Sequence, residues 1–172
     1  MTPQILFVDQ HHATLIVGPL GVVVWRGEAS PSAVRRVLEL GIATAAANPS
    51  GFGMIGVVEL GAKAPDATSR QLSASINDEL AAKGAVGFAA IIPQPGFAGA
   101  WIRAVVTSLN WLARNDYPFR AYESSEMACQ WLLQSLLSSP AEYQEVARVL
   151  DAFRERYGIA SESGSFVSLG PI

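Results

Sequence analysis

The chain is poor in the residues that most enzymes and metal sites use. Among its 172 residues there are one cysteine, Cys129, and two histidines, His11 and His12. A single cysteine excludes an intramolecular disulfide and a zinc site built from cysteines, and its apolar neighbours predict a buried core thiol. The scarcity of histidine removes the commonest general base. We therefore expect no catalytic residues, no metal and no cofactor.

Charged residues are also scarce, and they are not concentrated. Lys and Arg number 12 against 15 Asp and Glu, which gives a formal net charge of −3, and charged residues make up 16% of the chain. The longest basic run is Arg35-Arg36. Phosphate binding needs a concentrated basic face, so we expect no nucleic-acid partner.

Long apolar runs are missing too. No uninterrupted apolar run in the sequence approaches the roughly 18 residues that a membrane-spanning helix requires. The first ten residues lack the basic region and the long apolar core of a signal peptide. These features predict a cytoplasmic protein without a membrane span. Half of the residues are nevertheless hydrophobic, which is ample for a buried core.

The chain does contain a regular succession of strand and helix patterns. Three short runs rich in β-branched and aromatic residues come first, at 5–9, 13–18 and 21–27. Their joints are only a few residues long, so we predict antiparallel hairpins. The later elements are predicted to be a helix from Pro31 to about residue 48, a strand at 52–60, a helix at 66–83, a strand at 85–92, a helix at 97–114, a strand at 118–122, and helices at 125–137 and 139–158.

Strand patterns of two kinds define the fold class. The strand runs at 52–60 and 85–92 are continuously apolar rather than alternating, which indicates parallel strands covered on both faces. A hairpin followed by βα crossovers requires a mixed sheet. We therefore predict an α/β fold with a mixed sheet opened by an antiparallel hairpin, with helices packed on it. An extra C-terminal helix is predicted to start at a capping box formed by Ser139 and Glu142.

Two motifs fail the structural context that their chemistry needs. Residues 51–56, Gly-Phe-Gly-Met-Ile-Gly, match the dinucleotide fingerprint. That fingerprint must follow a strand and open a helix, whereas these glycines lead into a strand. His11 and His12 lie in the first predicted hairpin turn. Adjacent residues of a strand project to opposite faces, so they are unsuited to one metal ion, and we expect both to be solvated.

The predicted helix at 97–114 has an unusually wide apolar surface. Only a narrow polar stripe interrupts it, whereas a surface helix needs an apolar arc of only roughly 100°. One explanation is that the sheet and the C-terminal helix cover this helix from two sides. The other is a face for a protein partner, for a second copy in a homodimer, or for a small hydrophobic ligand or lipid. The residues of that candidate face are Phe97, Trp101, Ala104, Ser108 and Trp111.

The helix at 66–83 begins with Asp-Ala-Thr-Ser, which has two interpretations. Asp66 is a conventional N-cap for a helix whose stripe of Leu72, Ile76 and Leu80 is predicted to be buried. Thr68 and Ser69 are candidate phosphorylation sites, because the N-terminus of a helix favours phosphate charge. The sequence leaves both interpretations open.

The segment Tyr117-Pro118-Phe119-Arg120-Ala121-Tyr122, with the following Ser125-Glu126-Met127-Ala128 and Trp131-Leu132, resembles the STAS domain (sulfate transporter and anti-sigma factor antagonist). It is similar to the small bacterial STAS-like branch, whose last strand reads much like "FRxF" before a helix of "EEAxxWL" character. The resemblance covers roughly residues 1–138. It leaves an appended helix at 139–158 and a Ser/Gly-containing tail at 159–172 outside.

The resemblance implies a non-catalytic interaction module with a regulatory or scaffolding role. Anti-sigma antagonists bind a kinase-like partner and are released by phosphorylation at a helix start after a central strand. Here Asp66 is retained at that place, whereas Ala67 stands where the family has serine. In the tail, Phe166, Val167 and Leu169 form a small apolar patch, which is a docking peptide or folds back on the domain.

Overall fold

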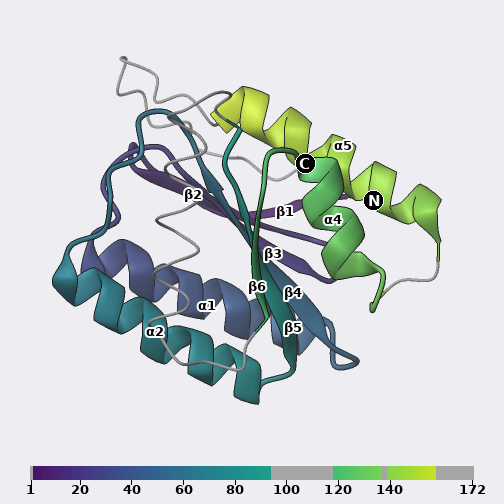
Figure 1. Cartoon of the computed structure of the whole chain (residues 1–172), viewed down its shortest axis with the longest axis horizontal. Coiled ribbons are helices and arrows are strands. Elements are labelled where there is room, and N and C mark those ends of the chain that lie inside the picture. The colour runs from purple at the N-terminus through teal and green to yellow at the C-terminus, as the bar shows by residue number, and fades with distance from the viewer. Residues whose placement is uncertain (1, 94–117, 137–138, 158–172) are drawn as a thin grey trace.

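A six-stranded mixed sheet between two layers of helices forms the described part of the protein (Figure 1). The structure is a computed structural model, and it describes residues 2–93, 118–136 and 139–157. Helices α1 and α2 lie on one face of the sheet, and α4 and α5 lie on the other. The elements are β1 (Gln4–Val8), β2 (His12–Val17), β3 (Leu20–Trp25), α1 (Pro31–Ala47), β4 (Phe52–Val58), α2 (Ala67–Ala82), β5 (Ala85–Ile91), β6 (Phe119–Tyr122), α4 (Ser125–Leu133) and α5 (Pro140–Tyr157).

The strands follow one another across the sheet in the order β1-β2-β3-β4-β5-β6. β1, β2 and β3 pair antiparallel, as their short joints require. β3, β4, β5 and β6 pair parallel. The prediction of an α/β fold with a mixed sheet opened by an antiparallel hairpin is therefore confirmed. β1 and β6 are the two edge strands of the described sheet.

Helices α1 and α2 pack closely on each other and on the sheet. The Ser30 hydroxyl accepts a hydrogen bond from the backbone N–H of Ala33 and caps α1, with Pro31 at the first helical position. A side chain at Gly41 would place its Cβ only 2.2 Å from a methyl carbon of Leu80 in α2. Glycine at this position therefore allows α1 and α2 to approach each other.

Helices α4 and α5 cover the other face of the sheet over the larger cluster of buried residues. Leu132 of α4 and Leu150 of α5 are both buried in it. The predicted capping box at the start of α5 is present: Ser139 and Glu142 exchange backbone-to-side-chain hydrogen bonds of 3.2 and 3.4 Å. Near the other end of α5, Arg154 pairs with Glu59 at 2.8 Å and joins the helix to the loop after β4. Among the described helices, none is both long and apolar enough to cross a membrane.

Candidate functional site

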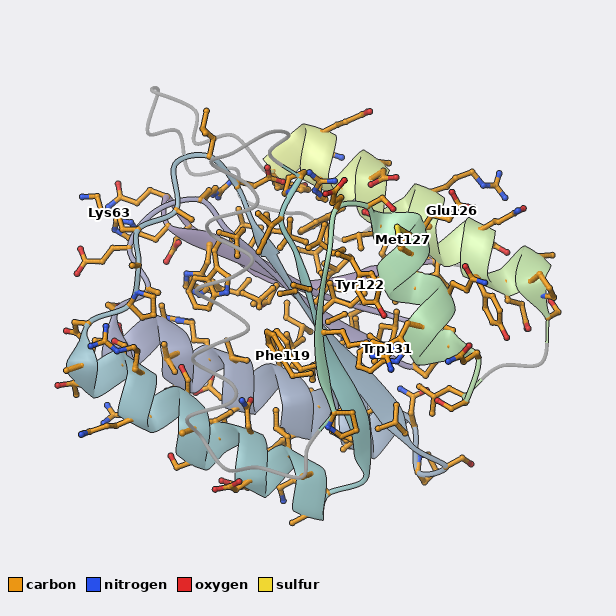
Figure 2. The ribbon with its side chains drawn as sticks, in the orientation of Figure 1. Lys63, Phe119, Tyr122, Glu126, Met127 and Trp131 are labelled. Atoms are coloured by element: carbon orange, nitrogen blue, oxygen red, sulfur yellow. The ribbon has the colours of Figure 1, made fainter. Side chains whose placement is uncertain are left out.

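The edge of the sheet at β6 carries a mixed aromatic and polar surface together with α4. We call it the β6–α4 surface. Tyr122, Met127 and Trp131 crowd the α4 side of β6, and Phe119 lies on the other side of the strand (Figure 2). Its residues are Phe119, Arg120, Tyr122, Glu126, Met127 and Trp131.

Alternation along β6 sorts these side chains onto two faces. Phe119 stacks on Phe88 of β5, with ring centroids 5.6 Å apart, on the α2 side of the sheet. Tyr122 faces α4 instead, and its ring lies 5.9 Å from that of Trp131. Arg120 is on the same side as Tyr122, because its guanidinium carbon lies 5.3 Å from the Trp131 ring centroid. One strand thus supplies aromatic groups to both faces of the edge.

Trp131 is the centre of the surface, and a glycine makes room for it. An added Cβ at Gly87 of β5 would lie 2.9 Å from the indole ring and 3.0 Å from the Pro118 carbonyl oxygen. The ring therefore lies directly against the backbone of β5. A guanidinium near an aromatic ring gains a cation–π attraction of about 0.5–1 kcal/mol at an exposed site. Arg120 and Trp131 accordingly hold each other at the edge of the sheet.

Met127 projects from the first turn of α4 into solvent. Its side chain is 54% exposed, while Ala128 and Cys129, the next two residues, are buried. The Ser124 hydroxyl accepts a hydrogen bond from the Met127 backbone N–H, so the start of the helix is capped at this residue. An unbranched thioether adapts to irregular surfaces and is over-used at binding surfaces. Met127 therefore adds an adaptable apolar contact beside the aromatic rings.

The interaction residues predicted from sequence fall elsewhere. Phe97, Trp101, Ala104, Ser108 and Trp111 lie outside the described residues, and so do the tail residues Phe166, Val167 and Leu169. The β6–α4 residues were recognised only as carriers of a family resemblance. A usable signal was present, since the "FRAY" strand places an arginine between two aromatic residues and Met127 follows the acidic Glu126.

At the start of α2, the structure separates the two candidate phosphorylation sites. Asp66 caps the helix by accepting a 2.7 Å hydrogen bond from the Ser69 backbone N–H, as predicted. That bond lowers the pKa of the Asp66 carboxyl. Ser69 is fully buried, whereas Thr68 is exposed. Of the two candidate sites, only Thr68 is therefore accessible from solvent on the folded helix.

The prediction that both histidines are solvated is wrong for His12. Its side chain is buried at the start of β2, between the rings of Phe7 and Trp25 at centroid distances of 5.0 and 5.5 Å. His12 Nδ1 lies 3.1 Å from an Asp9 carboxylate oxygen. Neither ring nitrogen has a hydrogen-bond partner of good geometry among the described residues, so Asp9 acts on the ring chiefly as a nearby negative charge. The His12 ring is covered on both sides by aromatic residues of two other strands. The local hairpin pattern could not predict this, because it arises only in the tertiary structure.

Burial of His12 predicts a pH dependence of stability. Burial is the main cause that lowers the pKa of His12, and Arg36 and His11 lower it further, against the opposing effect of Asp9. The unfolded chain then binds a proton more readily, so the unfolding free energy falls as pH drops below about 6.5, by up to about 1.4 kcal/mol per pH unit. Urea titrations between about pH 7.5 and pH 5 measure this slope.

The matched controls for that slope are two histidine variants. His12→Phe should flatten the dependence by keeping an aromatic ring between Phe7 and Trp25 without a titrating group. His11→Gln should leave most of the dependence in place, because the half-buried His11 has the smallest of the effects on the His12 pKa. An unchanged slope in His12→Phe would show that other groups cause the acid sensitivity.

The single cysteine and the nearby polar groups do not form a reactive site. Cys129 is buried, as predicted, and burial, with a smaller effect of Asp151, raises the pKa of its thiol to about 12. A thiol with so high a pKa is a poor nucleophile at neutral pH. Ser125 donates a 2.6 Å hydrogen bond to Asp151, which links α4 to α5. This bond joins two helices and involves no histidine.

A shallow pocket of about 250 Å³ lies between β1, β2 and α1. It is smaller than the roughly 300–1,000 Å³ sites that enclose drug-sized ligands, and Arg36 and Glu39 make part of its wall charged. It therefore adds nothing in favour of the hydrophobic-ligand hypothesis. No group of three His, Cys, Asp or Glu side chains within the described ranges is placed to hold a metal ion. The residues that line the pocket are Leu6, Phe7, Thr14, Arg36, Glu39, Leu40 and Ala43.

The fold and the β6–α4 surface together define the class of the molecule, an α/β protein whose mixed sheet ends in an aromatic edge. No family model, curated protein or solved structure matches the chain. The resemblance to the STAS-like branch consequently rests on the residues of this sequence. Those at 119–122 and 125–132 are the residues that build β6 and most of α4.

Proposed function

We propose that the protein is a cytoplasmic, non-enzymatic regulatory or scaffolding domain of STAS-like architecture that binds a protein partner through the β6–α4 surface. One observation carries the proposal, which is the clustering of Tyr122, Trp131 and the 54% exposed Met127 beside an edge strand. Tyrosine, tryptophan, methionine and arginine are enriched at protein interfaces, and aromatic residues and arginine dominate binding energy. The surface contains each of these four residue types.

The polar residues of the surface fit the same function. Arg120 is exposed beside the Trp131 ring, and Glu126 is exposed in the first turn of α4 next to Met127 in the chain. Charged residues around an apolar centre contribute more to specificity and to association rate than to affinity. Arg120 near Trp131 is also held by the ring, so less side-chain freedom is lost on binding. An apolar centre with polar surroundings is the usual anatomy of a specific interface.

A pull-down with matched surface variants tests the proposal. Met127→Glu places a charge on the most exposed apolar side chain of the surface. Ile42→Glu does the same at a residue of α1 that is 42% exposed and lies on the other face of the sheet. Proteins retained by the wild type and by Ile42→Glu should be depleted at least fivefold on Met127→Glu when quantified by mass spectrometry.

The pull-down comparison is valid only if the wild type and both variants are equally folded. Circular dichroism melting curves of the two variants and the wild type provide that check, since exposed substitutions usually change stability by less than about 0.5 kcal/mol. If all three proteins retain the same partners in equal amounts, the β6–α4 surface is not the binding site. Co-purified lipid or another small apolar molecule in native mass spectra would instead favour a carrier.

A further inference from the structure

Within the described residues no strand pairs with the outer side of β6, and the backbone groups of this strand follow a defined alternation. The Pro118 carbonyl accepts a 2.8 Å hydrogen bond from the backbone N–H of Phe88 in β5, and the Tyr122 carbonyl accepts a 2.9 Å hydrogen bond from that of Ile92, just after β5. Alternate residues of a strand direct their backbone groups toward the same neighbour. Arg120 therefore also faces β5, whereas the N–H and C=O groups of Phe119 and Ala121 point away from it.

The two edges of the described sheet differ in their suitability for pairing. β1 has a register shift between Ile5 and Phe7, and a bulge in an edge strand opposes pairing with another chain. β6 keeps an unbroken register with β5 from Phe119 to Tyr122. Its edge is therefore a regular template for one more strand.

From this geometry we propose that the partner of the β6–α4 surface is a second copy of the chain, with the two β6 strands paired antiparallel across a twofold axis at Ala121. The inference rests on the proposed function, because it names the partner of the same surface. Pairing of this kind joins two six-stranded sheets into one continuous sheet. A twofold axis makes the contact isologous, so the same residues act on both sides.

The register follows from two independent conditions. Opposite residues of antiparallel strands place their side chains on the same face, so the axis must pass through a residue and not between two. An axis at Arg120 would set two arginines opposite each other, which is destabilising. An axis at Ala121 uses a residue whose backbone groups point outward and gives two hydrogen bonds between the copies. Phe119 also points its backbone groups outward, but it is the first residue of β6, so an axis there would pair Arg120 with a residue outside the strand. Ala121 is therefore the residue at which the β6 strands pair along their length.

The side chains on the α4 face are complementary to themselves in this register. Arg120 lies opposite Tyr122 of the second copy, where a guanidinium and an aromatic ring attract each other. Because of the twofold axis, this contact occurs twice. The exposed Met127 supplies apolar area on the same side of the edge. On the α4 face, the contact therefore sets arginine against tyrosine rather than like charges against each other.

Sedimentation equilibrium of the purified full chain tests the association. The wild type should sediment as a dimer, and Arg120→Glu should raise the dimer dissociation constant at least tenfold by removing both arginine–tyrosine contacts. Arg35→Glu, at an exposed arginine of α1, is the matched charge reversal and should leave the constant unchanged. Equal effects of the two reversals would overturn the proposal.

Disulfide trapping tests the register without relying on a destabilised variant. Residues in a hydrogen-bonded antiparallel pair have Cα atoms about 5.5 Å apart, within the range that a disulfide spans. Ala121→Cys should give a covalent dimer under mild oxidation, at least ten times faster than Leu60→Cys, whose residue is 87% exposed in a loop. The buried Cys129, with its pKa of about 12, does not compete.

The results separate this inference from the proposed function. A protein that sediments as a monomer, with Ala121→Cys cross-linking no faster than Leu60→Cys, overturns the second copy as partner. If Met127→Glu nevertheless fails to retain some other protein that the wild type retains, the proposed function stands with that protein as the partner. If a dimer forms but Arg120→Glu and Ala121→Cys show no effect at β6, the copies meet elsewhere and the inference is wrong.

Discussion

Replacing Leu132 with alanine is expected to lower the unfolding free energy by about 2–5 kcal/mol, the range for a leucine lost from a core. Leu132 is buried in α4 and lies over the sheet where Gly53 and Gly87 carry no side chains. Leu132 methyl carbons lie 3.2 and 3.5 Å from where Cβ atoms at these glycines would be. The backbone there cannot fill the space that alanine leaves, so the effect should fall in the upper half of the range.

Urea unfolding followed by tryptophan fluorescence measures this loss. Ile42→Ala is the matched control, since it removes an aliphatic side chain from an exposed helical position and should change stability by less than about 0.5 kcal/mol. A loss below about 1 kcal/mol in Leu132→Ala would mean that α4 moves to close the cavity. If Leu132→Ala also weakened partner binding in the pull-down, the cause would be a shift of the neighbouring Trp131 together with α4.

Replacing Arg26 with methionine is expected to cost about 2–3 kcal/mol. The buried Arg26 guanidinium donates to the backbone carbonyls of Asp9 and Tyr157 and so joins the end of β1 to the end of α5. Methionine keeps the apolar stem and leaves both carbonyls without this donor. Burial lowers the pKa of Arg26, so removing the charge recovers some desolvation energy and offsets part of the loss.

Two measurements distinguish a local from a global effect of Arg26→Met. Urea unfolding gives the change in stability, and limited proteolysis detects opening of α5 near Tyr157. Arg35→Met, at an exposed arginine on α1, should leave both unchanged. An equal or higher stability of Arg26→Met would mean that desolvation outweighs the two hydrogen bonds.

Local patterns predicted the described elements of the fold with small errors at their ends, while the helix predicted at 97–114 lies outside the described residues. The helix expected to start at Pro31 does so and ends at Ala47, because Ser30 and Asn48 are local caps. The helix expected at 125–137 ends at Leu133. Ile76 and Leu80 of α2 are buried as predicted, with Leu72 packed beside them. Such features depend on residues within one or two turns, so they can be read directly from the chain.

The candidate site depended on contacts that no local pattern contains. Met127 has the same helical environment in sequence as its buried neighbours, and only the position of α4 at the sheet edge exposes it. Trp131 lies beside Arg120 because β6 and α4 fold back on each other across the Gly87 backbone. His12 is buried because Phe7 and Trp25, on two different strands, close over it.

The sequence by itself determined the succession of strands and helices, the α/β class and the mixed sheet, because apolar spacing, caps and joint lengths act over short distances. Only the tertiary structure decided that the strands lie in chain order and that β6 forms an edge. It also decided which apolar side chains on that edge meet solvent. Exposure depends on what covers a residue, and the covering groups come from distant parts of the chain.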